Sequence, residues 1–205
     1  MFITLEGPDG SGKSSQMSPL AEVIRQQGYD VIETREPGGT EIGDQIRQVI
    51  MDLQNKRMQP ESEILLFQAS RAQLVRELIR PALADGKVVL CDRYADSTIA
   101  YQGYGHQTDI EQLTRIVEFA TGGLKPDLTL YLDIDAEQGL RRRSDGEGEW
   151  NRLDDYALEF HQRVRRGYHA MIAAESERWV QIDGDQPPEA VQQEMQKAVM
   201  ERLGG

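Results

Sequence analysis

Cysteine is almost absent from this chain of 205 residues, where Cys91 is the only one. A single thiol excludes a disulfide within the chain and any metal site built from several cysteines. We expect Cys91 to pack in the interior as a small apolar side chain. The histidines, His106, His161 and His169, show no spacing typical of a metal site, so we interpret them as structural or surface residues.

Long apolar runs are also missing, and no segment approaches the roughly 18 residues that a membrane-spanning helix needs. The opening residues, MFITLEG, lack a basic segment and a cleavable apolar stretch, so we expect a strand there and no signal peptide. These absences predict a cytoplasmic protein without a membrane partner. The length predicts one domain over residues 1–205, because two ordinary domains and a linker need more chain.

Basic residues are outnumbered by acidic ones, 23 against 35, which gives a formal net charge of -12. Such a chain would repel a polyanion, so we expect no nucleic-acid partner. Positive charge is nevertheless concentrated at 141–143 and at 163–166, where arginines cluster. These clusters are candidates for binding a small anion such as phosphate.

Short apolar segments rich in β-branched residues alternate with longer segments of helical period. The predicted strands are 2–6, 30–34, 87–92, 127–134 and 179–183, and the predicted helices are 13–27, 41–52, 60–84, 109–121, 153–174 and 188–203. This alternation predicts an α/β domain with a parallel sheet. Within 153–174, a core-facing stripe is expected from Tyr156, Phe160, Val164, Tyr168 and Ile172.

The segment GPDGSGKS, at 7–14, matches the phosphate-binding pattern G-x-x-x-x-G-K-[ST] between a predicted strand and a predicted helix. Glycines let successive backbone N–H groups and the positive end of the helix point at phosphate oxygens. Lys13 would bridge the β- and γ-phosphates, and Ser14 would hold Mg2+ through its hydroxyl. The ATP-binding residues expected here are Gly7, Pro8, Asp9, Gly10, Ser11, Gly12, Lys13, Ser14 and Ser15. The alternative, a glycine turn beside a solvated lysine, explains the pattern less well.

Binding a nucleoside triphosphate does not specify a reaction, because kinases, GTPases and motor ATPases share this loop. The guanine-reading pattern N-K-x-D is absent, and the chain is short for a motor. The acidic, glycine-containing segment 144–150 lies between an arginine cluster and a predicted helix. It is either a solvated turn or part of a lid at about 141–152, and the arginines on both sides favour a mobile lid.

Five motifs taken together resemble the bacterial thymidylate kinases, and the resemblance covers residues 2–173. In chain order they are GPDGSGKS, TREPGGT, LLFQASRAQ, CDRYADSTIAYQG and KPDLTLYLDI. The resemblance implies a three-layer P-loop NTPase fold with a five-stranded parallel sheet. It also implies a dTMP kinase that makes dTDP and ADP from ATP and dTMP, with Mg2+, for dTTP biosynthesis. A homodimer formed through long helices such as 60–84 is implied as well.

The second motif ends a strand at the site of the monophosphate in that family. Glu36 and Pro37 are therefore expected to bind dTMP, and Glu36 is a candidate partner for a water on Mg2+ or for the sugar. A Pro-Gly turn alone would explain Pro37 and the glycines that follow it, but not the charged residues.

The third motif places Phe67 and Arg71 four residues apart, on one face of a predicted helix. A phenyl ring that stacks on a pyrimidine and a guanidinium that donates to its O4 would together bind thymine, which are the roles these positions have in the family. Periodicity alone would equally suit a core phenylalanine and a surface arginine.

The fourth motif ends a buried strand with Asp92 and Arg93, at the edge where open α/β sheets bind ligands. Asp92 can position Mg2+ and Arg93 can hold the acceptor phosphate, although a plain salt bridge is the alternative. The residues that follow, Ser97, Tyr101 and Gln102, match family positions around the sugar and base. Tyr101 is expected to disfavour ribonucleotides, and Gln102 to contact the base edge.

The resemblance also gives Asp9 a reason to stand beside phosphates, since in the family it accepts from the 3'-hydroxyl of the acceptor. Eukaryotic relatives carry an arginine where this chain has Gly10. In the bacterial pattern the compensating arginines come from the lid, which here means some of Arg141, Arg142, Arg143 and Arg152. Among them we assign catalytic roles to Arg143 and Arg152, beside Lys13 and Arg93. The segment 183–191 resembles the loop that lies against adenine.

Two alternatives to a dTMP kinase remain open. A P-loop kinase for another nucleotide or for a deoxynucleoside would differ in the pocket of Phe67, Arg71 and Tyr101. A nucleotide-dependent switch or binding module would use the same loop, with a partner protein sensing the bound state. The arginines of the expected lid argue against a switch, which needs no clamp on an acceptor phosphate.

Overall fold

The computed structural model describes residues 1–145 and 150–204. Five parallel strands form one sheet in the order β2-β3-β1-β4-β5, with β1 (Phe2–Glu6) at its centre. The other strands are β2 (Val31–Arg35), β3 (Val88–Asp92), β4 (Leu128–Asp133) and β5 (Trp179–Asp183). The expected parallel sheet is confirmed, and each predicted strand is present with its ends shifted by at most one residue.

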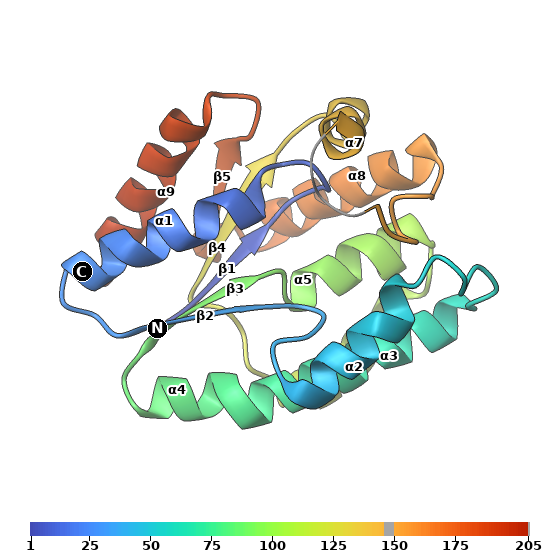
Figure 1. The fold of residues 1–205 in the computed structure, drawn as a ribbon, viewed down its shortest axis with the longest axis horizontal. Coiled ribbons are helices and arrows are strands. Elements are labelled where there is room, and N and C mark those ends of the chain that lie inside the picture. Colours follow the sequence, from blue (N-terminus) through green and yellow to red (C-terminus); the bar gives the residue numbers. More distant parts are fainter. Residues whose placement is uncertain (146–149, 205) are drawn as a thin grey trace.

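Helices cover both faces of the sheet, as Figure 1 shows. One face carries α1 (Lys13–Gln26) and α9 (Pro188–Leu203). The other carries α3 (Pro60–Leu74), which continues through the π-helical turn η1 (Val75–Ile79) into α4 (Arg80–Ala84), and it also carries α8 (Leu158–Ala174). The remaining elements are α2 (Glu41–Met51), α5 (Ala95–Thr98), the π-helical turn η2 (Ile99–Gly105), α6 (Ile110–Thr121), α7 (Ala136–Asp145) and the 3-10 turn η3 (Ser176–Arg178). The three-layer arrangement expected for the fold is therefore observed.

The two cores follow from the alternation of side chains along the strands. In β4, Leu130 packs with α1 and α9, whereas the next residue, Tyr131, packs with α8 on the opposite face. In β3, Leu90 packs on the face covered by α1 and α9, and Cys91 packs on the opposite face. Cys91 is fully buried, as expected. The stripe predicted for α8 is confirmed, because its members pack with Tyr131 and Trp179.

Several helix boundaries differ from the predictions for local reasons. The helix expected over 60–84 contains η1, in which the N–H of Arg80 donates to the carbonyl of Val75. Pro81 follows directly, and its ring has no N–H and crowds the preceding turn, which favours such a widened turn. The helix expected from 153 begins only at Leu158, because the residues before it form turns. In these turns the backbone N–H and the side-chain amide of Asn151 both donate to Asp154 Oδ2. The elements α5 with η2, and α7, were not predicted.

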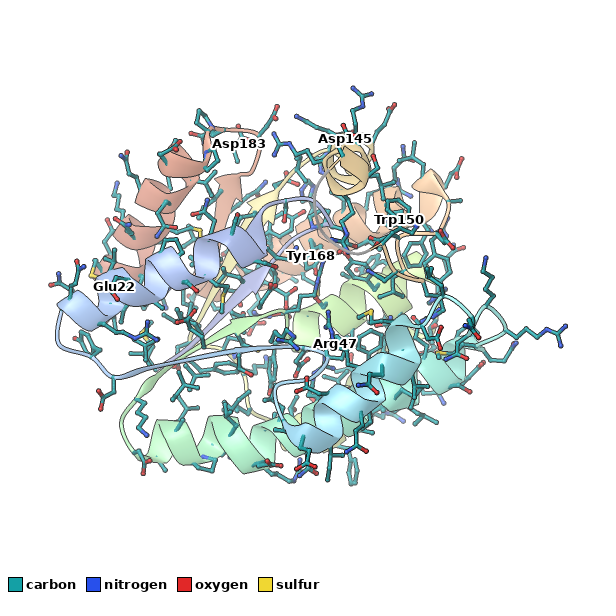
Figure 2. The ribbon with its side chains drawn as sticks, viewed as in Figure 1. Glu22, Arg47, Asp145, Trp150, Tyr168 and Asp183 are labelled. Carbon is teal, nitrogen blue, oxygen red and sulfur yellow. The ribbon has the colours of Figure 1, made fainter. Side chains whose placement is uncertain are left out.

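Most charged side chains lie at the surface. In Figure 2, Glu22, Asp145 and Asp183 lie toward the outside of the molecule, whereas Tyr168 lies in its interior. None of the helices within 1–145 and 150–204 combines the length and the apolar character that a membrane crossing requires. The expected cytoplasmic location stays a prediction.

The phosphate-binding loop packs directly against α7 through two glycines. Gly10 has a φ of +78°, and a Cβ built on it would lie 2.0 Å from the carbonyl oxygen of Gly139. Conversely, a Cβ on Gly139 would lie 2.5 Å from the carbonyl oxygen of Asp9. Neither position tolerates a side chain while the loop and α7 stay in contact. An arginine at position 10, as in the eukaryotic relatives, has no room here.

We expect Gly139→Ala to lower the melting temperature by about 2–4 °C, as thermal denaturation would measure, because a net loss of about 1 kcal/mol has this effect in a chain of this length. Alanine normally stabilises a helix interior by about 1 kcal/mol relative to glycine, but here the added methyl must separate α7 from the loop, and overpacking of this kind costs about 1–3 kcal/mol. Glu137→Ala, on the exposed side of the same helix, serves as the control. An unchanged or higher melting temperature for Gly139→Ala would contradict the close contact.

Candidate active site

The loops that follow β1 and β3 meet at one edge of the sheet. These strands are neighbours, with Leu5 paired to Asp92, but the chain leaves them in opposite directions, toward β2 and toward β4. Open α/β sheets bind ligands in the crevice that such a reversal creates. A cavity of about 510 Å³ lies there.

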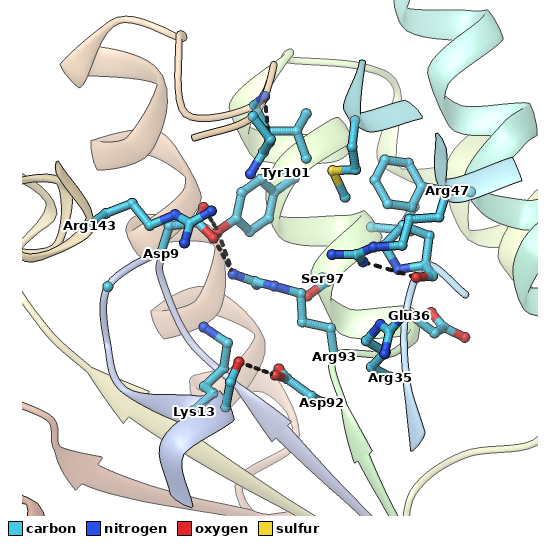
Figure 3. A pocket seen from close by; sticks show the side chains of 18 of the residues that line it. Asp9, Lys13, Arg35, Glu36, Arg47, Asp92, Arg93, Ser97, Tyr101 and Arg143 are labelled. Carbon is cyan, nitrogen blue, oxygen red and sulfur yellow. Dashed lines mark hydrogen bonds and ion pairs between the residues drawn. The ribbon is translucent and has the colours of Figure 1, made fainter. Parts of the chain in front are cut away.

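Most residues predicted for the site line this cavity. They are Asp9, Gly10, Gly12, Lys13, Ser14, Ser15, Glu36, Pro37, Phe67, Arg71, Asp92, Arg93, Ser97, Tyr101, Gln102 and Arg143. Four others, Gly7, Pro8, Ser11 and Arg152, are not among the described residues that line it. Side chains from the loop, from β3 and from α7 converge on this space, and Lys13, Arg93 and Arg143 all extend into it in Figure 3.

Lys13 begins α1 and turns back over the phosphate-binding loop. Its Nζ donates to the carbonyl oxygens of Gly7 and Pro8 at 3.0 and 2.9 Å, and to Ser11 Oγ at 3.2 Å. Burial, followed by the charge of Arg93, lowers the pKa of Lys13 to about 8. The ammonium form therefore predominates at neutral pH, held beside the N-terminus of a helix, where anions bind favourably.

Ser14 and Asp92 join the two loops. The Ser14 hydroxyl donates to Asp92 Oδ2 at 2.7 Å, a contact that Figure 3 marks. A hydroxyl and a carboxylate oxygen side by side are hard oxygen ligands of the kind that Mg2+ accepts. The two residues therefore fit the predicted metal-binding role.

Arg93 connects more of the site than any other side chain described in it. Its Nη2 donates to Asp9 Oδ1 at 2.7 Å and to the Tyr101 hydroxyl at 3.1 Å, and its Nη1 donates to Gly7 O at 3.0 Å and Ser97 Oγ at 3.2 Å. The Tyr101 hydroxyl in turn donates to Asp9 Oδ2 at 2.6 Å. Burial opposes ionisation of Asp9, but the positive charges of Arg93 and Lys13 and the hydrogen bond from Tyr101 together outweigh it and hold the pKa of Asp9 well below its usual range. The acid within the phosphate-binding loop is thus neutralised by its neighbour.

Glu6 fixes the backbone around Arg93, and sequence reasoning missed it. Arg93 has a φ of +69°, a left-handed conformation that is unfavourable for a side chain of this size. The N–H of the next residue, Tyr94, donates to Glu6 Oε1 at 2.7 Å, while Ser97 Oγ and the Tyr168 hydroxyl donate to Glu6 Oε2 at 2.6 and 2.7 Å. Glu6 is fully buried at the end of β1. From the sequence, it was predicted only to be part of a strand.

Glu36 and Arg71 form a buried ion pair. Arg71 Nε and Nη2 donate to Glu36 Oε2 at 2.7 and 2.5 Å, and Arg71 Nη1 donates to Gln68 Oε1 and Thr98 Oγ1. Burial raises the pKa of Glu36 even though Arg71 opposes the shift. Glu36 Oε1 is buried and accepts no hydrogen bond from the described residues. An unpaired acceptor at the cavity suits a ligand hydroxyl or a metal-bound water, the two partners foreseen for Glu36.

The family model described as Thymidylate kinase matches residues 5–195 of this chain. The chain belongs to the thymidylate kinase family. It is 53% identical over 206 residues to the thymidylate kinase of Roseiflexus sp. (strain RS-1), covering 95% of this chain and 91% of the relative. It is 48% identical to that of Exiguobacterium sp. (strain ATCC BAA-1283 / AT1b), covering 99% and 95%. The crystal structure of thymidylate kinase from Ehrlichia chaffeensis superposes with a TM-score of 0.80 at 32% identity, covering 97% of this chain and 98% of that one.

The arginines that the family resemblance assigned to the lid lie in different surroundings. Arg143 lines the cavity and pairs with Asp154 at 3.3 Å. Arg142 donates to Gly184 O at 2.8 Å in the loop expected to lie against adenine. Arg152 is turned away into a buried pair with Glu63. Part of the predicted lid, 146–149, lies outside the described residues.

Arg47 of α2 is a further cavity residue that sequence reasoning missed. Its Nη1 donates to Pro37 O at 3.0 Å, and Figure 3 shows its guanidinium reaching toward the cavity. Burial, followed by the charge of Arg35, lowers the pKa of Arg47. A helical arginine has no distinguishing sequence signal, and only the packing of α2 against α3 brings it to the site.

Burial, followed by the charge of Asp96, raises the pKa of Glu6 to about 7 from an ordinary value of 4.5. Between these pH values the folded protein binds more protons than the unfolded chain. The contribution of Glu6 to the free energy of unfolding therefore falls as pH rises from about 4.5 to about 7, by up to about 1.4 kcal/mol per pH unit. Glu6→Gln removes this titration. We expect the variant's melting temperature, relative to the unsubstituted protein, to improve from pH 5 to about pH 7 and to change little above that. Parallel curves for the two proteins would refute the buried titration.

Proposed function

We propose that this protein transfers the γ-phosphoryl group of ATP to dTMP and releases dTDP and ADP. The supporting observation is one continuous cavity that joins the phosphate-binding residues Lys13 and Ser14 to the aromatic and amide side chains of Phe67 and Gln102. A donor triphosphate and an acceptor nucleotide can meet there. Membership of the thymidylate kinase family supports dTMP as the acceptor.

The donor phosphates would occupy the loop before α1. Lys13 would exchange its contacts with the carbonyl oxygens of Gly7 and Pro8 for the β- and γ-phosphates, which replaces neutral acceptors by charged ones. Backbone N–H groups and the positive end of α1 would add to this attraction. The loop would therefore hold the γ-phosphate at the end of β1.

The acceptor phosphate would lie beside Arg93, directly opposite the donor. Asp9 and Ser97 hold Arg93 in place before any ligand binds. Its guanidinium therefore needs little reorganisation when charge develops on the phosphoryl group during transfer. The acceptor phosphate is already an anion, so the reaction needs no general base. In-line placement of the two nucleotides and exclusion of water carry most of the catalysis.

Mg2+ is proposed as the cofactor, held by Ser14 and Asp92 with help from Glu36. No cluster of three or more His, Cys, Asp and Glu side chains suited to a metal occurs within 1–145 and 150–204. Mg2+ in kinases commonly takes only one or two protein oxygens, together with waters and substrate phosphates, so this set fits. When bound, the ion would neutralise charge on the β- and γ-phosphates.

We further propose that residues 1–205 form a single P-loop kinase domain whose lid spans about 141–152. Arg143 and Arg152 flank the undescribed part of that segment, and Arg143 already lines the cavity. The side chain of Arg143, which pairs with Asp154, is 24% exposed, so a phosphate can compete with Asp154 for its guanidinium. The catalytic role of Arg152 stays a prediction.

To test the proposed function, ADP production from ATP and Mg2+ would be measured with dTMP, dUMP, UMP, dCMP, CMP, AMP, GMP and thymidine as separate acceptors. We expect a strong preference for dTMP, because the base end of the cavity combines Phe67 with Gln102. Preference for another acceptor would keep the P-loop kinase assignment and reject the thymine pocket. Hydrolysis that no acceptor stimulates would favour a nucleotide-dependent switch.

Three variants separate the assigned roles within the same assay. Lys13→Ala and Arg93→Ala should lower kcat by about 100-fold or more, because each removes charge that stabilises the transferred group. Phe67→Ala should instead raise KM for dTMP by about tenfold with a smaller change in kcat, because it removes stacking on the base. Equal losses of kcat in all three, with KM for dTMP unchanged, would contradict these roles.

A homodimer is proposed as well, through α2, α3 and α6. α3 packs against both other helices, and the three present large apolar side chains to solvent: Ile42, Val49, Leu65, Ile110 and Phe119. Phe119 is 83% exposed, which is unusual for a phenylalanine on a surface that no other chain covers. A second copy would cover this face.

We expect light scattering coupled to gel filtration to give the mass of a dimer for the unsubstituted protein and of a monomer for the double variant Leu65→Glu and Phe119→Glu. Charges at the centre of an apolar contact oppose association. Tyr29→Glu, at another exposed aromatic residue beside the end of α9, should remain a dimer. A monomeric unsubstituted protein, or a double variant that stays dimeric, would reject this interface.

A further inference from the structure

Glu63 is a buried carboxylate behind the base end of the cavity, and neither the sequence nor the proposed mechanism gives it a role. Its side chain is 1% exposed. Oε1 accepts from Gln102 Nε2 at 2.7 Å and lies 3.2 Å from His106 Nε2, while Oε2 accepts from Arg152 Nη2 at 2.5 Å and from the Tyr156 hydroxyl at 3.2 Å. The carboxylate thus joins α3, η2 and the chain that follows the lid.

This carboxylate is ionised at neutral pH. Burial opposes the charge, but hydrogen bonding to His106, the positive charge of Arg152 and the amide of Gln102 outweigh burial and lower the pKa of Glu63 to about 2. An ionised carboxylate has acceptor oxygens and no donor. Every group that faces Glu63 closely must therefore donate to it.

That requirement fixes the side-chain amide of Gln102. The NH2 group has to face Glu63, because the amide oxygen would meet another acceptor. Gln102 lines the cavity, and its amide oxygen accepts no hydrogen bond from the described residues. The end of the amide that remains for a ligand is consequently the oxygen, an acceptor.

We infer that Glu63 is a positioning residue that sets the base preference of the acceptor site by presenting only the amide oxygen of Gln102 to the base. The inference rests on the proposed function. The N3–H group of thymine or uracil donates to that oxygen. Cytosine carries an unprotonated, accepting N3 at the same place, so two acceptors would face each other.

The other base contacts come from the same helix. Phe67 and Arg71 follow Glu63 at intervals of four residues on α3, so all three lie on one face of that helix. Arg71 also lines the cavity, but its five N–H groups already donate to Glu36, Gln68, Thr98 and the carbonyl oxygen of Tyr94, so it would have to exchange one of these contacts to reach the 4-carbonyl of thymine. The described contacts therefore assign the choice between the two bases to the amide oxygen of Gln102, which Glu63 positions. Sites that leave a buried polar group unpaired with the wrong substrate discriminate by about 100-fold or more.

The experiment compares kcat/KM for dTMP and dCMP in the unsubstituted enzyme and in Glu63→Gln. The new amide at position 63 can donate or accept, so Gln102 is free to turn either way. We expect the dTMP to dCMP ratio to fall at least about tenfold, mainly through the KM values. Asp96→Asn is the matched control, because Asp96 is a buried acid paired with Arg178 that makes no contact with Gln102. The control should keep the ratio even if its stability and total activity decrease.

A second pair of variants shows whether Glu63 acts through Gln102 and covers the case in which Glu63→Gln fails to fold. Gln102→Leu leaves Glu63 and Arg152 paired, and it should by itself lower the ratio about as far as Glu63→Gln. Adding Glu63→Gln to Gln102→Leu should lower the ratio no further.

Three outcomes would overturn the inference: an unchanged ratio in Glu63→Gln, an unchanged ratio in Gln102→Leu, or fully additive losses in the double variant. If the unsubstituted enzyme phosphorylates dTMP and any of these occurs, the positioning role alone is rejected. If the unsubstituted enzyme does not act on dTMP, the proposed function itself is rejected.

Discussion

The ion pair between Arg93 and Asp9 is the interaction on which the rest of the site depends. It ties the loop after β1 to the end of β3, across the crevice where the chain reverses direction. Both side chains are largely withdrawn from water, so removal of either would leave a buried charge without compensation. Because Asp9 is neutralised within the loop, Lys13 and Arg47 keep the cavity attractive to anions in a protein whose net charge is -12.

Buried glutamates support the groups that would contact substrates. Glu6 holds the backbone beside Arg93, Glu36 holds the guanidinium of Arg71, and Glu63 holds the amide of Gln102. Their pKa values diverge for local reasons. Burial and Asp96 raise the pKa of Glu6, whereas the donors around Glu63, Arg152 among them, lower the pKa of Glu63 despite burial. Each carboxylate fixes its partner before a ligand arrives, which reduces the entropy lost on binding.

The sequence predicted the parts of the fold and site whose signal is local. The strands and the phosphate-binding loop were found because their patterns are contiguous, and Asp92 and Arg93 because polar residues follow a buried strand. Glu6 and Glu63 were not found, because their partners are distant in the chain, as with Tyr94 and Gln102. The segment of α5 and η2 was missed because its glycines and its wide turn obscure the helical period.

The arginines at the two ends of the proposed lid seemed equivalent in sequence, but their surroundings separate them. Releasing Arg152 toward a phosphate would leave Glu63, which is 1% exposed, without its arginine, and a buried carboxylate that loses its charged partner is destabilised by several kcal/mol. Arg143 lines the cavity, is partly in contact with solvent and pairs with Asp154, which also accepts from the backbone N–H and the side-chain amide of Asn151. Electrostatics therefore favours Arg143 as the arginine that reaches the transferred group, and Arg152 as the charge that keeps Glu63 ionised.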